Sequence, residues 1–119
     1  DSLLVFNCGS TGIQKIENLP ESLLLLNCGS TGITKIKNLP SKLQALDISN
    51  VQGISKIEKL PSSLLLLDIS YSRGINVLEN LPKGLLELKA DYTRIKRYDL
   101  PKSLKKISMI KKTKSVYRF

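Results

Sequence analysis

The side chains best suited to chemistry in this sequence are two cysteines, Cys8 and Cys28. A catalytic thiol needs an activating neighbour, and a metal site needs more ligands than two thiols supply. The chain has no histidine, so the usual general base and the commonest metal ligand are both missing. We therefore expect inward-facing, inert thiols. So few cysteines favour a reducing compartment, such as the cytoplasm, a host cytoplasm or a virus particle, over a secreted disulfide framework.

Two further patterns resemble catalytic motifs. The segment Gly9-Ser10-Thr11-Gly12 returns as Gly29-Ser30-Thr31-Gly32, but it lacks the spacing and the Lys-Ser/Thr of a phosphate-binding loop. Its recurrence indicates a turn. Asp47 and Asp68 have a spacing that could suit acid/base chemistry, yet they fit an acidic step on a surface better. We expect no enzymatic activity, no cofactor, no metal and no small-molecule substrate.

An internal period organises the chain. Each of the five prolines follows a leucine, and the Leu-Pro pairs recur about every twenty residues. Proline fixes its own backbone and disfavours helix in the residue before it, so each pair punctuates a repeat. We expect one domain, with units at about 1-18, 19-38, 39-59, 60-80, 81-99 and 100-119, the last a basic C-terminal cap. The chain starts at Asp1 inside a unit and without a Met, so we expect a preceding segment.

Apolar residues fall at fixed gaps inside each unit. The gap of two between Leu26 and Cys28 alternates as in a strand, and the later gaps of three suit a partly helical or extended return segment. One unit alone buries too little apolar surface to offset the conformational entropy that it loses on folding, so the units must stack with parallel strands. Stacking predicts a single internal row made of Leu26, Leu46, Leu67 and Leu88.

The string Leu23-x-x-Leu26-x-Cys28-x-x-Thr31-x-Ile33 resembles the leucine-rich-repeat consensus. The Leu-Pro period resembles the short repeats of secreted bacterial effectors of the IpaH and YopM type, and those of large DNA viruses of protists. The resemblance implies an α/β-type repeat solenoid of about six repeats. Its parallel sheet would be concave, and its convex segments irregular or short helical. Threonine stands where the family has a turn-capping Asn, and its hydroxyl can make some of the same bonds.

The predicted concave face offers a candidate binding surface. An aliphatic strip, made of Val5, Leu25 and Leu66 with Leu4, Leu24 and Leu65 beside them, would lie partly exposed next to a polar column. Such a strip either marks a contact surface or packs sideways on itself and stiffens the sheet. The residues predicted to contact a partner are Asn7, Leu25, Asn27, Asp47, Leu66, Asp68, Tyr71, Lys89 and Tyr92.

The formal charge of +9 lies entirely in the last third, because residues 1–82 are neutral overall. A basic patch there comprises Lys105, Lys106, Lys111, Lys112, Lys114 and Arg118. This patch would attract an acidic protein, nucleic-acid phosphate or an anionic membrane, or it would only shield the open end of the stack. An acidic protein is favoured over nucleic acid, since aromatic stacking platforms and a recognised nucleic-acid motif are missing.

These observations favour a protein-protein interaction module. No apolar run is long enough for a membrane span. One alternative is a structural component of a larger assembly such as a virus particle. Another is nucleic-acid or anionic-surface binding through the basic C-terminal end.

Overall fold

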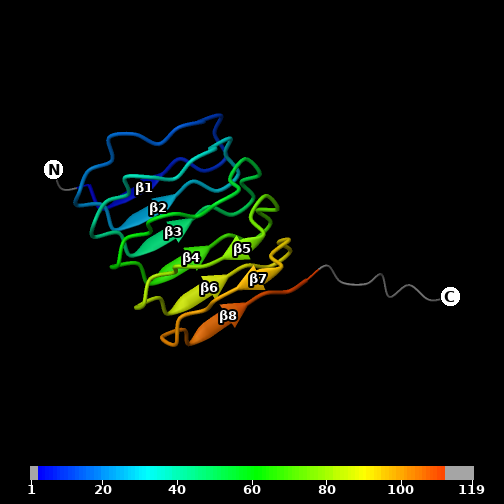
Figure 1. Cartoon of the computed structure of the whole chain (residues 1–119). Coiled ribbons are helices and arrows are strands. Elements are labelled where there is room, and N and C mark those ends of the chain that lie inside the picture. The colour runs from blue at the N-terminus through cyan, green and yellow to red at the C-terminus, as the bar shows by residue number, and fades with distance from the viewer. Residues whose placement is uncertain (1–2, 112–119) are drawn as a thin grey trace.

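The computed structural model describes residues 3–111, which form a solenoid of stacked coils (Figure 1). Each coil contributes one short strand to a six-stranded sheet with the order β1-β2-β3-β4-β6-β8. Neighbouring strands run parallel, because every coil returns to the same side before the next strand begins. The strands are β1 (Val5–Asn7), β2 (Leu25–Asn27), β3 (Ala45–Asp47), β4 (Leu66–Asp68), β6 (Glu87–Lys89) and β8 (Lys106–Ser108).

The predicted internal row is confirmed. Leu26 pairs in register with Leu46, Leu46 with Leu67, and Leu67 with Leu88. Each of these side chains is at most 2% exposed. Side chains alternate across a strand, so the residue two positions later also points inwards. This second inward column holds Cys8, Cys28, Ile48, Ile69 and Ala90, all buried.

Of the two alternatives for the return segments, the non-helical one is confirmed, and the short helices of the other do not occur in residues 3–111. No helix occurs in residues 3–111, and hence none that could cross a membrane. The segments are irregular apart from β5 (Val77–Leu78) and β7 (Arg97–Tyr98), which pair in parallel. The described part of the chain is therefore a β-solenoid and not an α/β-type fold.

Coil length explains why helices are excluded. In a unit of about twenty residues, the return segment must cover the same distance as the strand side with a similar number of residues. Nine helical residues advance only about 13 Å, whereas nine extended residues advance about 30 Å. Only an extended return segment closes the coil.

Two corners of each of the first four coils, and one corner of the fifth, adopt the left-handed backbone conformation. None of the residues there is glycine, and Asn and Ser occupy most of the positions. Asn tolerates this conformation better than most residues, because its short polar side chain bonds locally. One corner follows the strand, and the other precedes the Leu-Pro pair. The residues are Ser10, Ser30, Asn50, Tyr71 and Tyr92 at the first corner, and Asn18, Asn38, Lys59 and Asn80 at the second.

Hydroxyl groups close the corner after the strand, as predicted. The Thr31 hydroxyl donates to the carbonyl oxygen of Cys28 at 2.7 Å. Thr11 and Thr93 make the same bond to the carbonyls of Cys8 and Ala90, at 2.6 and 3.0 Å.

The third coil has Val51 at this corner in place of threonine, and a hydroxyl group of the fourth coil makes the bond instead. The side chain of Ser72 donates to the carbonyl of Ile48 at 2.7 Å and accepts the N–H of Val51 at 3.0 Å. The third and fourth coils also hold one extra residue here. Four steps separate Asn50 from the buried Ile54, whereas three steps separate Ser30 from its counterpart Ile33.

Candidate interaction surface

Strand side chains that point away from the core form the sheet face, the surface expected as the concave face. The aliphatic strip on it remains open to solvent, so sideways packing does not close it. Its exposed fractions are 50% for Leu4, 54% for Val5, 42% for Leu25 and 40% for Leu65. Leu24 and Leu66 are half-buried.

Backbone bonds between coils define rows across the sheet face. The N–H of Leu86 donates to the carbonyl of Leu65, and the N–H of Lys105 donates to the carbonyl of Leu86. Leu86, which is 39% exposed, therefore extends the aliphatic strip by one coil. The strip ends at the last coil, where Lys105 and Lys106 take the equivalent positions.

The polar column beside the strip caps the strand ends. In four successive coils, the side-chain oxygen of an Asn or Asp accepts the backbone N–H of the residue two positions later, at 2.9–3.0 Å. This i to i+2 bond is an Asx turn. The sequence carries its signal, an Asn or Asp two residues before Gly or Ser, although these residues were predicted as partner contacts and not as turn caps. The pairs are Asn7 with Gly9, Asn27 with Gly29, Asp47 with Ser49, and Asp68 with Ser70.

Asp47 and Asp68 pair in register on β3 and β4, and both are half-buried. One oxygen of each carboxylate is taken by its turn. No group of three or more potential metal ligands occurs among residues 3–111. The arrangement is that of two turn caps beside each other on the sheet face.

Lys89 interrupts the polar column, because it stands where the earlier coils have a turn-capping Asn or Asp. In this coil Asp91, two residues later, bonds to the next coil instead. One oxygen of Asp91 accepts the N–H of Ile110 at 2.9 Å and the hydroxyl of Ser108 at 2.5 Å. The bond from the Ile110 N–H, followed by that from Ser108, holds the pKa of Asp91 below its usual value. The negatively charged form of this carboxylate thus ties β8 to β6.

Tyr71 and Tyr92 stack on each other at the far rim of the sheet face. Their ring centroids lie 5.1 Å apart with an interplanar angle of 23°. Both residues have a left-handed backbone, at φ 64° and 56°. The structure brings these two predicted contact residues together, and their stacking has no signal in the sequence.

The basic patch is described only in part. Lys105, directly before β8, and Lys106, its first residue, are exposed. The Lys111 amine donates to the carbonyl of Ile95 at 2.5 Å. Within residues 3–111 the only ion pair joins Lys89 to Glu87 at 4.0 Å. The remaining predicted members, Lys112, Lys114 and Arg118, lie outside the described residues.

The two cysteines form a buried contact, as predicted. Their sulfur atoms lie 3.0 Å apart, and neither is in a disulfide. Burial raises the pKa of the Cys28 thiol, and the neighbouring Cys8 raises it further. A protonated, inaccessible thiol is a poor nucleophile and a poor metal ligand.

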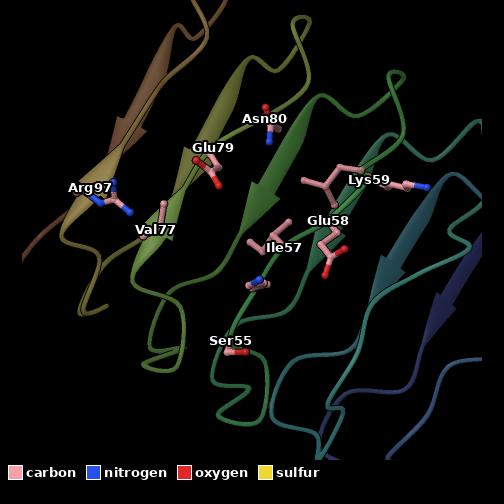
Figure 2. A pocket seen from close by; sticks show the side chains of 10 residues that line it. Ser55, Ile57, Glu58, Lys59, Val77, Glu79, Asn80 and Arg97 are labelled. Atoms are coloured by element: carbon pink, nitrogen blue, oxygen red, sulfur yellow. The ribbon is translucent and has the colours of Figure 1, made fainter.

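A groove of about 680 Å³ runs along three neighbouring return segments on the opposite side of the coils (Figure 2). Charged side chains of both signs line it, among them Glu58, Lys59, Glu79 and Arg97. Similar grooves of about 510 and 420 Å³ lie between earlier return segments. Because the groove recurs with the repeat, it reflects the spacing of the coils and not a dedicated ligand site.

Stacked parallel strands, an internal leucine row and a hydroxyl-closed corner define a parallel-strand solenoid consistent with a leucine-rich-repeat protein. Among solved structures, the chain is similar to YopM from Yersinia enterocolitica WA-314 with 20% identity and a TM-score of 0.47. The similarity covers 90% of this chain and 33% of that chain, so this chain spans about a third of its length. No protein family and no curated protein matches the chain by sequence.

Proposed function

We propose that this chain is a non-enzymatic protein-protein interaction module that binds its partner on the sheet face. The observation that carries the proposal is the aliphatic strip, whose exposed members, with Leu86, are 39–54% open to solvent. These side chains stand on a hydrogen-bonded sheet above a fully buried core, so their spacing is fixed. Covering them gains roughly 25 cal/mol for each Å² of apolar surface removed from water.

A triple substitution tests this proposal. Leu25→Ser, Leu65→Ser and Leu86→Ser together remove three exposed side chains from the strip without opening the core. The matched control carries Gln14→Ser, Thr34→Ser and Asn76→Ser, three exposed and uncharged positions on the return segments. Affinity capture followed by mass spectrometry should find proteins that the native chain and the control retain and the strip variant loses.

Unchanged capture by the strip variant would refute binding on the sheet face, provided that its thermal melting matches that of the control. Asp47 and Asp68 are left intact in this design, because their carboxylates cap turns and their loss would disturb the fold.

Nucleic-acid binding through the basic end is the second candidate. The stacked Tyr71 and Tyr92 rings supply an aromatic element, and the exposed Lys105 and Lys106 supply a basic one. Phosphate contacts weaken steeply as salt rises. A single-stranded oligonucleotide whose affinity does not change between 50 and 200 mM salt, or that does not bind, would remove this candidate.

A structural role in a larger assembly is the third candidate, and the exposed Leu4 and Val5 at the start of β1 suit it. Size-exclusion chromatography of the purified chain distinguishes it from the interaction module. A component of an assembly should aggregate or elute with its neighbours, whereas an independent binding module should elute as a monomer.

A further inference from the structure

Charge is distributed unevenly along the sheet face. Over β1 to β4 the outward side chains are aliphatic or uncharged, apart from Asp47 and Asp68, each of which gives one oxygen to its own turn. Over β6 and β8 one acid, Glu87, is outnumbered by three lysines: Lys89 on β6, Lys106 on β8, and Lys105 directly before β8. The sheet face thus changes from aliphatic to basic between the fourth coil and the last.

The two outermost lysines are not neutralised within the described part of the chain. Glu87 lies 4.0 Å from Lys89, and no other ion pair occurs in residues 3–111. Asp91 is the nearest further acid in sequence to Lys89, and its carboxylate is held by Ile110 and Ser108. Lys105 and Lys106 therefore offer two free ammonium groups at the end of the aliphatic strip.

Register fixes the distance between the two kinds of surface. Leu65, Leu86 and Lys105 occupy one row, and Leu66, Glu87 and Lys106 the next. Adjacent strands lie about 4.8 Å apart, so Lys105 stands about 5 Å from the row position of Leu86 and about 10 Å from that of Leu65. The stacked Tyr71 and Tyr92 rings bound the same two coils at the other rim.

We propose, building on the interaction function above, that the sheet face binds a peptide segment with aliphatic residues followed by at least two carboxylates. The aliphatic residues lie over Leu65 and Leu86, and the carboxylates pair with Lys105 and Lys106. From β2 to β8 the sheet spans four strand spacings, about 19 Å, which an extended segment covers in about six residues.

The same features disfavour other partners. Aliphatic side chains do not stack on bases, and Asp47 and Asp68 repel phosphate groups along the middle of the sheet face. A peptide that carries apolar and acidic groups in sequence satisfies the strip and the lysines together, and charge complementarity fixes its direction.

Selection from a random library of twelve-residue peptides, displayed against the full chain, tests the proposal. Enriched peptides should combine Leu, Ile or Val with two or more Asp or Glu on one side. Their affinities, measured by fluorescence anisotropy, should fall about tenfold for Lys105→Glu with Lys106→Glu, and less for the milder pair of Gln substitutions. Lys35→Glu with Lys37→Glu, on an exposed return segment, changes the net charge equally and should leave the affinities unchanged.

The outcomes separate this proposal from the general function. Peptides that lose affinity for Leu65→Ser with Leu86→Ser but carry no acidic residues would overturn the acidic specificity and leave the sheet face as the binding site. Peptides indifferent to both the leucine and the lysine substitutions would overturn both. An unrelated oligonucleotide that displaces the selected peptides at equal concentration would assign the lysines to phosphate and overturn the peptide partner.

Discussion

Ser72 shows how a single hydroxyl joins two coils. It is fully buried and serves the carbonyl of Ile48 and the N–H of Val51, two backbone groups of the preceding coil. Ser72→Ala leaves both without this partner, so it should lower the free energy of unfolding by about 1–3 kcal/mol. Denaturant unfolding measures the loss. Ser62→Ala, at an exposed serine of the same unit, should change stability little, and equal losses for the two variants would contradict this role.

Gly74 marks a close approach between backbones. A Cβ atom at this position would lie 2.6 Å from the carbonyl oxygen of Ile54 and 3.0 Å from that of Gln52. Gly74→Ala should therefore cost roughly 1–3 kcal/mol of stability, because backbone must move to admit the methyl group. Gly12, where a Cβ would meet nothing within 4 Å, supplies the matched control. A Gly74→Ala melting temperature as high as that of Gly12→Ala would refute the clash.

At the residue scale, side-chain hydrogen bonds within a coil were predictable from the sequence, and those between coils were not. The threonine hydroxyls were predictable from the position of Thr31 relative to the consensus. The role of Ser72 was not, because Val51 gives no hint that its missing hydroxyl comes from twenty-one residues further on. The Asx turns were visible in the spacing of Asn27 and Gly29 and were interpreted only as surface.

At the scale of elements, Asp91 makes the attachment of β8 to β6 dependent on pH. Its pKa is lowered in the folded chain, so its contribution is present above the unfolded pKa of about 3.9 and is lost as pH falls through the folded value. The native chain should lose more thermal stability between pH 7 and pH 3 than Asp91→Asn, whose amide oxygen can still accept the Ile110 N–H. Equal losses for the two proteins would contradict a role for the carboxylate charge.

The return segments were predictable in position and ambiguous in conformation. Gaps of three apolar positions, as from Ile33 to Ile36, suit a helix and an extended segment alike. Length resolves the ambiguity, because a helical return would be less than half as long as the strand side of the coil. The sequence carries no signal for the pairing of β5 with β7. The paired residues Val77 and Arg97 differ in chemical type, one being apolar and the other charged, so no repeating pattern marks them.

At the scale of the whole molecule, the internal leucine row should make the coils unfold together. Leu46 is fully buried between Leu26 of β2 and Leu67 of β4. Leu46→Ala should therefore lower the free energy of unfolding by about 2–5 kcal/mol. Ile107 occupies the equivalent inward position on β8 but is 48% exposed, so Ile107→Ala should cost clearly less. Guanidinium unfolding should remain a single transition for both, and separate transitions would show that the coils unfold independently.

The stacking register was the most predictable property of the molecule. The spacing of Leu26, Leu46, Leu67 and Leu88 fixed which side chains turn inwards, and their in-register pairing follows. The surface was less predictable, because exposure of the aliphatic strip depends on how neighbouring side chains cover one another. The position of Leu86 in the strip emerges only from the backbone bonds between coils.

The extra residue in the third and fourth coils shows where this architecture tolerates insertion. Asn50 and Tyr71 keep the same left-handed corner as Ser30, and the added residue is absorbed before Ile54 and Ile75 return to the core. An insertion within a strand or return segment would instead shift every later side chain of that coil to the wrong face. Insertions are thus tolerated at the corner that follows the strand. A longer loop at this corner would change the surface there and leave the leucine rows aligned.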